Sequence, residues 1–331
     1  HEKVKKRSLS LFEPRPELDE KRKAENKKKL NSTPNRAESN NDQSGKAHHR
    51  NDEIEMKSSI YQICYSQETF DQVPDGFLKL DYRGNERADW REYWPIRKFL
   101  RSNHLSDDTL YGFMSPKFQH KTGLKHEDIQ RFLNSNYEQQ DVVSFSPFWD
   151  LSSIFKNIFE QGDFFHPGLA DACQEFADAH IAGINLRDSI THSQNNIFCN
   201  YFLAKKSFWM AWLELGDFLF EEAENSQSKL AKSLCETTTY GIQRLPMKIF
   251  VQERLATMCL LANKNFSCLS YSPFYMGAST TPFNQFLHES VISDALKIAY
   301  TQTHEHHYLS EFSSLRNKII QSLQKPRETQ R

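Results

Sequence analysis

Short apolar runs alternate with helical patterns along most of this chain, and that alternation restricts the folds open to it. The runs at 59–65, 109–115, 141–147, 196–204 and 266–271 have the length and the β-branched or aromatic character of buried strands. Amphipathic or apolar stretches between and after them predict helices, among them 151–159, 245–265 and 286–301. This order predicts an α/β fold in which helices flank a mostly parallel central sheet, with a helix-rich C-terminal half.

The first 58 residues contain too few apolar side chains to form a core, so we predict a disordered linker or tail over 1–58. The folded domain is expected at 59–310, followed by a helical or disordered tail at 311–331. The sequence begins with His1 rather than Met. We therefore expect it to be a piece of a longer polypeptide, with other domains of that polypeptide as partners.

Charge and glycine content exclude several classes of protein. Residues 1–58 hold 15 Lys and Arg against 11 Asp and Glu, whereas the whole chain has a net charge of −1, so the predicted domain is mildly acidic. A broad basic face for nucleic acid is not expected. The chain has only 11 glycines, and neither GxGxxG nor GxxxxGK[ST] occurs.

Cysteine spacing and hydropathy indicate the compartment. The six cysteines stand singly in apolar surroundings, which favours reduced core thiols over a disulfide framework or a zinc site. No signal peptide and no apolar run of about 20 residues is present. We expect a cytoplasmic protein, either free or peripheral at the inner membrane.

Ligands of an α/β sheet bind beyond the carboxyl ends of its parallel strands, and Asp150 lies at such a place. It follows the predicted strand 141–147 within "SPFWD", where a carboxylate can hold a divalent cation. The alternative is that Asp150 caps the helix that begins there.

A second polar cluster, "EQGDFFHPG" at 160–168, contains Glu160, Asp163 and His166. Carboxylate and imidazole groups this close together suit a metal or acid/base site. The alternative is an ordinary surface connection, since Gly and Pro loops collect polar residues.

Basic and aromatic residues gather after the first two predicted strands. The stretch "LDYRGNERADWREYW" at 80–94 includes Asp81, Arg83 and Arg91 beside aromatic rings, a combination that suits stacking on a base or sugar and binding of phosphate. The alternative is that its aromatic rings pack on the sheet. "GFMSPKFQHKTG" at 112–123 adds Lys117, His120 and Lys121, a weaker signal for a diphosphate.

Four stretches together resemble a family. "DWREYWPIRKFL", "LYGFMSPKF", "DVVSFSPFWD" and "NYFLAKKSFWMAWLELGDFLFEEA" are similar to uncharacterised bacterial proteins of capsule and O-antigen gene clusters, and more distantly to GT-A-like glycosyltransferases. The resemblance spans about 59–275. It is carried by Asn200, by Lys205 or Lys206 ahead of Phe208 and Trp212, and by Glu253-Arg254-Leu255.

The resemblance implies a glycosyltransferase of bacterial surface-polysaccharide synthesis that moves a sugar from a nucleotide-sugar donor to a glycan or lipid-linked acceptor. Asp163 or Glu253 would then be the catalytic base, and His166 and Asn200 would contact the acceptor. Asp81, Arg83, Arg91 and Lys117 would bind the donor.

The Asp-x-Asp metal anchor usual in that fold is missing. Either Asp150 alone binds Mn²⁺ or Mg²⁺, or the reaction is independent of metal. The alternative function is a non-catalytic carbohydrate-binding or scaffold module attached to a larger glycosyltransferase.

Overall fold

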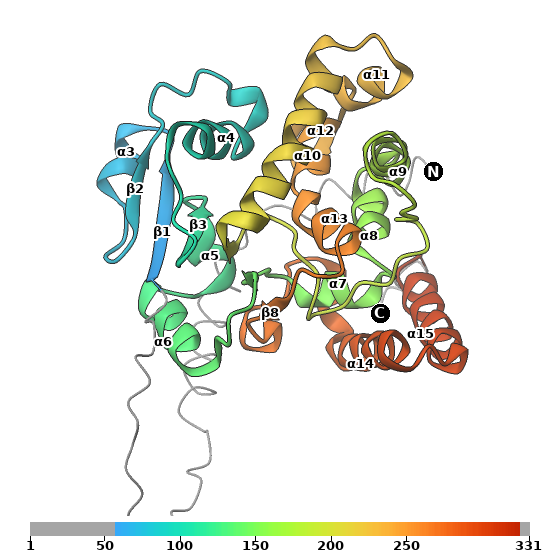
Figure 1. The fold of residues 1–331 in the computed structure, drawn as a ribbon. Helices are drawn as coiled ribbons and strands as arrows, with labels where there is room; N and C mark the ends of the chain where they lie inside the picture. Colours follow the sequence, from blue (N-terminus) through green and yellow to red (C-terminus); the bar gives the residue numbers. More distant parts are fainter. Residues whose placement is uncertain (1–56, 325–331) are drawn as a thin grey trace, which may run out of the picture.

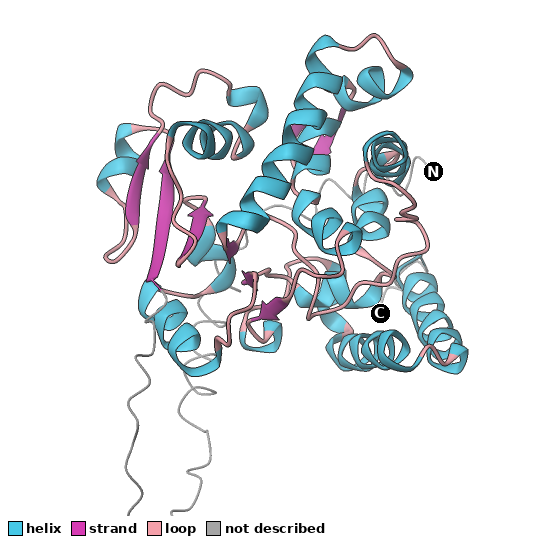
Figure 2. Cartoon of the chain, viewed as in Figure 1, coloured by secondary structure: helices cyan, strands magenta, loops and turns pink. Residues whose placement is uncertain are grey.

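The computed structural model describes residues 57–324, in which helices flank a central sheet (Figures 1 and 2). Most of the predicted linker 1–58 and the end of the predicted tail therefore lie outside the described residues. The strands of the central sheet are β1 (Lys57–Cys64), β2 (Leu78–Asp81), β3 (Thr109–Met114), β4 (Val142–Ser144), β5 (Phe202–Ala204) and β8 (Cys268–Ser270).

The central sheet has the order β2-β1-β3-β5-β4-β8 and is mixed. β1 pairs in parallel with both β2 and β3, and β4 pairs in parallel with β8. β5 is antiparallel to both of its neighbours, β3 and β4, so five strands run one way and β5 runs the other. The α/β class and the mostly parallel sheet predicted from the sequence are confirmed, with β5 as the exception.

The helix-rich C-terminal half is also confirmed. The helices before β5 are α3 (Gln67–Asp71), α4 (Tyr93–Ser102), α5 (Phe118–Thr122), α6 (His126–Asn136), α7 (Trp149–Ile154), α8 (Ile158–Phe165) and α9 (Leu169–His180), with a 3-10 turn η2 (Ala88–Trp90). After β5 come α10 (Lys206–Asn225), α11 (Lys229–Cys235), α12 (Met247–Gln252), α13 (Leu255–Ala262), α14 (Leu287–Thr303) and α15 (His306–Gln324). A hairpin of β6 (Thr237–Tyr240) and β7 (Gln243–Pro246) precedes α12.

Helix α10 is the central packing element, because it contacts α4, α9, α11, α12, α13 and β3. Its Trp209 and Trp212 are fully buried, and the Trp209 ring stacks on Phe202 of β5. The indole N–H of Trp209 donates to the Tyr111 carbonyl at 2.9 Å, which ties α10 to β3. In the same place Gly112 lets β3 approach β5, since a Cβ there would lie 2.1 Å from a Leu203 methyl.

Two predicted helices are interrupted in the structure. The pattern 151–159 divides at Asn157, whose side chain accepts from the backbone N–H groups of Phe159 and Glu160 and so begins α8. The expected helix 245–265 starts as strand β7, continues as α12 and breaks at Glu253–Arg254 before α13. Periodicity cannot reveal such breaks, because side-chain hydrogen bonds set them.

Helix α14 buries polar residues rather than apolar ones. Ser290, Ser293, Asp294 and Lys297 are at most 1% exposed. The Lys297 ammonium donates to the carbonyls of Ser152 and Phe155 at 2.8 Å each, and Asp294 accepts from the Ser193 N–H at 2.9 Å. These contacts fix α14 to the end of α7 and to the loop before β5. The segment 311–331, predicted as a tail, contains most of α15.

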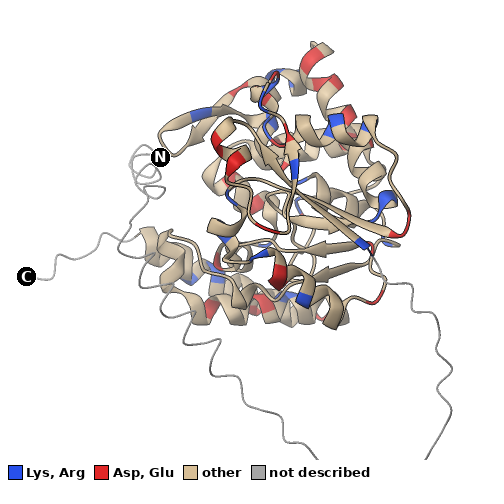
Figure 3. Ribbon diagram, turned by 90° about the vertical axis from the view of Figure 1, so that its left-hand side faces the viewer, with Lys and Arg blue, Asp and Glu red and all other residues tan. Residues whose placement is uncertain are grey.

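Acidic and basic residues are interspersed over the elements seen in Figure 3. Many are paired; Lys248, for example, is buried between Asp89 and Glu224 at 2.8 and 2.9 Å. None of the helices between residues 57 and 324 has both the length and the apolar character needed to cross a bilayer.

Candidate functional site

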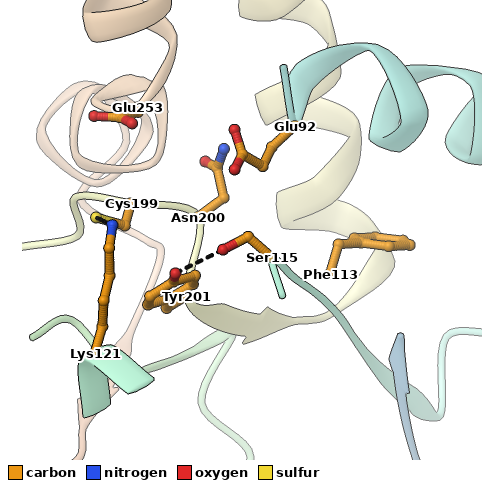
Figure 4. A pocket seen from close by; sticks show the side chains of 8 residues that line it. All are labelled: Glu92, Phe113, Ser115, Lys121, Cys199, Asn200, Tyr201 and Glu253. Atoms are coloured by element: carbon orange, nitrogen blue, oxygen red, sulfur yellow. Dashed lines mark hydrogen bonds between the residues drawn. The ribbon is translucent and has the colours of Figure 1, made fainter. Parts of the chain in front are cut away.

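A small cavity lies at the carboxyl edge of the sheet, where strand β3 ends and β5 begins. From β1 the chain crosses to β2 on one side and then to β3 on the other, so β1 and β3 form a topological switch point, the usual place for a ligand in such sheets. Because β5 is reversed, the residues that precede it lie at this same edge. The cavity is lined by Glu92, Phe113, Ser115, Lys121, Cys199, Asn200, Tyr201 and Glu253 (Figure 4).

The cavity volume is about 20 Å³, which is room for about one water molecule. Two of the chain segments that form it have backbones in the left-handed region, at Arg91 (φ 47°) beside Glu92 and at Cys199 (φ 54°) beside Asn200. Non-glycine residues rarely adopt this conformation, and such strain collects at functional sites.

One wall of the cavity joins strand β3 to helix α5 and the start of β5. The hydroxyls of Ser115 and Tyr201 are hydrogen bonded at 2.7 Å. The Lys121 ammonium donates to the Cys199 sulfur at 3.6 Å and lies 5.6 Å from the centre of the Tyr201 ring. Burial raises the pKa of the Cys199 thiol to about 11, so the thiol is neutral at physiological pH and is no nucleophile.

Two carboxylates, Glu92 and Glu253, face the cavity from different parts of the chain. Glu92 directly precedes α4, and Glu253 occupies the break between α12 and α13. Arg254 stabilises that break, since its guanidinium donates to the carbonyls of Phe250 and Ile158 and to the Gln161 side chain. Burial raises the pKa of Glu253, while Lys121 and Arg254 oppose the shift. A raised pKa suits a carboxylate that takes up a proton near neutral pH.

Asn200 completes the cavity and is only 3% exposed. Its side-chain amide donates to the Gln252 side chain at 3.2 Å, which links it to the residue before Glu253. Within residues 57–324 the Asn200 side-chain oxygen has no hydrogen-bond partner. The structure thus brings Asn200 and Glu253, both selected from the sequence, to one cavity.

The residues predicted to bind the donor lie outside the cavity lining. Arg83 forms an exposed ion pair with Asp81 at 2.6 Å and lies over the Phe70 ring. Arg91 precedes the lining residue Glu92, and Lys117 lies two positions after the lining residue Ser115. Both are exposed and form no ion pair with any residue of 57–324. Their roles in donor binding stay predictions.

Asp150 is fully buried at the start of α7, away from the cavity lining. Its oxygens accept from the backbone N–H of Ser279 at 2.8 Å and from the Ser279 hydroxyl at 2.6 Å. No group of three or more His, Cys, Asp or Glu residues within 57–324 is arranged to hold a metal ion. These surroundings do not fit a divalent cation, and we assign no reaction step to one.

Asp163 and His166 also lie outside the cavity lining. The Asp163 carboxylate accepts from the backbone N–H groups of Gly168 and Ala170 at 2.9 and 3.1 Å, at the start of α9. The buried His166 ring stacks on Phe250, with 3.7 Å between ring centres.

The buried His166 predicts a pH-dependent stability. Burial, reinforced by Arg254, lowers the pKa of His166 to about 3, against about 6.5 in an unfolded chain. The folded protein holds His166 in its neutral form. Its contribution to the free energy of unfolding is fully present above pH 6.5 and is lost as pH falls toward 3, by up to about 1.4 kcal/mol per pH unit. Between pH 7.5 and 5.5 the free energy of unfolding, measured with urea, should fall in both the unsubstituted protein and His166→Phe. We expect the fall to be about 1 kcal/mol smaller in His166→Phe. His288→Phe, at an exposed position, is the control; an equal loss in both variants would contradict the assignment.

Several cavity residues were not selected from the sequence. Lys121 gives only a weak signal in the sequence. Glu92, Ser115 and Tyr201 lie in stretches that carry the resemblance, but nothing in those stretches distinguishes them from their neighbours. Only the reversal of β5 and the approach of the α12–α13 break bring them together.

No protein-family model matches this sequence, and neither a curated protein nor a solved structure shows significant similarity to it.

Proposed function

We propose that this chain is a GT-A-like glycosyltransferase of bacterial surface-polysaccharide synthesis, which moves a sugar from a nucleotide-sugar donor to a glycan or lipid-linked acceptor. The observation that carries the proposal is the polar cavity at the β1/β3 switch point, where Glu253, with a raised pKa, lies beside Asn200 and Lys121. A positioned carboxylate and an amide that both donates and accepts are what the activation and holding of a sugar hydroxyl require.

In the proposed reaction, the acceptor oxygen forms a bond to the anomeric carbon of the donor sugar. The bond from that carbon to the diphosphate oxygen breaks, and its electron pair leaves with the diphosphate. Glu253 takes the proton of the acceptor hydroxyl. We propose that Arg91 and Lys117, which are exposed, close in sequence to lining residues and without an ion pair within 57–324, contact the diphosphate.

Binding of nucleotide sugars tests the proposal. We expect the 331-residue chain to bind at least one member of a panel of UDP-, GDP-, CMP- and dTDP-sugars by calorimetry and to release the nucleotide slowly, with or without Mn²⁺. If no donor is bound or hydrolysed under either condition, the enzyme proposal is wrong.

The second candidate is a non-catalytic carbohydrate-binding or scaffold module of a larger glycosyltransferase. The size of the cavity favours it, because about 20 Å³ is far below the several hundred Å³ of ordinary ligand pockets. A module of this kind would bind glycans without consuming any donor, so unchanged donor turnover by a full-length enzyme carrying Glu253→Gln would support it.

A further inference from the structure

The charge of the cavity lining is unbalanced. Glu92 and Glu253 contribute two carboxylates, and Lys121 contributes the single cation. The Lys121 ammonium is directed to the Cys199 sulfur, and its pKa is raised by Cys199 first and also by Tyr201 and Glu253, so it stays charged. The lining therefore has a net charge of about −1, which disfavours a phosphate and favours a cation.

The same lining offers hydrogen-bond acceptors that the described chain does not use. The carboxylates of Glu92 and Glu253 form neither a hydrogen bond nor an ion pair with any residue of 57–324. The Asn200 side-chain oxygen is buried and has no partner among the same residues. In Figure 4 the Asn200 amide lies between the Glu92 and Glu253 side chains, with its nitrogen on the side of Glu92 and its oxygen on the side of Cys199 and Glu253. Buried polar atoms are normally paired. A buried, unpartnered Asn200 oxygen beside two half-buried carboxylates therefore points to a ligand with several donors.

The size of the cavity restricts that ligand further. Room for about one water molecule matches an –NH₃⁺ group, whereas a phosphate, with five heavy atoms, exceeds it. A primary ammonium carries three N–H donors and one positive charge. Matching acceptors are present in the lining: the Glu92 carboxylate, the Asn200 side-chain oxygen and the Glu253 carboxylate. The charge of the ammonium offsets the net charge of the lining.

We propose that this cavity binds a primary ammonium group, with Glu92 and the Asn200 oxygen as its main partners. If the proposed glycosyltransferase function holds, on which this step depends, the acceptor is a sugar with a free amine. Its ammonium enters the cavity while its ring stays at the mouth, and a neighbouring hydroxyl faces Glu253. Glu92 is then a specificity-determining residue for the acceptor.

The test compares three methyl glycosides that differ only at carbon 2: the glucosaminide, the N-acetylglucosaminide and the glucoside. Binding to the 331-residue chain is measured at pH 7 by ligand-observed NMR titration. We expect the glucosaminide to bind about tenfold or more tightly than the other two, because a charged hydrogen-bonded pair is lost in each of them. Equal binding of the three glycosides, or no binding of the amine, would overturn the proposal.

Glu92→Gln should remove this preference and bring the three affinities within about twofold of one another. Glu138→Gln is the matched control, since it makes the same change of charge at an exposed site outside the cavity, and it should keep the preference. A preference that survives Glu92→Gln would contradict the assignment. Nucleotide-sugar binding, measured separately, distinguishes the two proposals: an amine preference without donor binding refutes the transferase only, and donor binding without an amine preference refutes the ammonium site only.

Discussion

Glu253→Gln is expected to lower the rate of sugar transfer by about 10²- to 10⁴-fold, the usual loss when a positioned general base is removed. Gln has the shape of Glu but cannot take up a proton, and it keeps the packing of the α12–α13 break. Because Glu253 is expected to act on the acceptor hydroxyl, the dissociation constant of the nucleotide sugar should change by less than about twofold. Single-turnover transfer rates together with donor titration give both quantities.

Asp163→Asn provides the comparison, because Asp163 is the other carboxylate that the sequence suggests as a base. Its carboxylate accepts from backbone N–H groups at the start of α9 and does not line the cavity. We expect a loss of stability of about 1 kcal/mol, with little change in the transfer rate of the folded protein. A large loss of transfer rate in Asp163→Asn, with no loss in Glu253→Gln, would mean that Asp163 rather than Glu253 is the catalytic base.

The sequence predicts the positions of β1, β3, β4 and β8 well, because each is a short apolar run bounded by polar residues. A pattern of this kind does not indicate the direction of β5 in the sheet. That direction depends on which strands pair, and β5 inserts between β3 and β4 through pairing with residues 58 to 93 positions away. The predicted strand 196–204 also shortens to three residues, since the left-handed Cys199 interrupts it.

The same limit applies to the candidate site. Asn200 and Glu253 were selected from a resemblance of local patterns, and the structure brings them to one cavity. Glu92 lies within the polar stretch that follows β2, where nothing in the sequence separates it from its charged neighbours. Asp150 follows β4 as predicted, yet it is buried against Ser279, a contact with a residue far along the chain. Asp150 is not the cap of α7 either, since Phe148 occupies that position. Local sequence does not reveal a contact with so distant a residue.

The polar face of α14 shows why amphipathic patterns can mislead. Its buried residues are serines, an aspartate and Lys297, and they replace apolar packing with hydrogen bonds to backbone groups of α7 and of the loop before β5. That loop leads directly to Cys199 and Asn200. The position of the cavity residues therefore depends on polar contacts from the C-terminal helices as well as on the sheet.

Trp209→Ala should reduce the free energy of unfolding by about 4 kcal/mol, the largest loss of stability that we expect from a single substitution. The Trp209 ring is fully buried against Phe202, Phe113 and Trp212. Its removal leaves a cavity between α10 and the sheet and leaves the Tyr111 carbonyl without its indole donor. Urea unfolding followed by circular dichroism measures the change.

Trp209→Phe separates the two causes, because it keeps an aromatic ring in the core but removes the N–H donor. We expect it to cost about 1 to 2 kcal/mol, the value of one buried hydrogen bond and a small void. Met210→Ala, at the neighbouring position on the outer face of α10, should change stability by less than about 1 kcal/mol, since Met210 is exposed. Equal losses of unfolding free energy at positions 209 and 210 would mean that α10 does not pack on β3 and β5 through its tryptophan face. Packing of α10 would then not hold the start of β5, with Asn200 and Tyr201, in place.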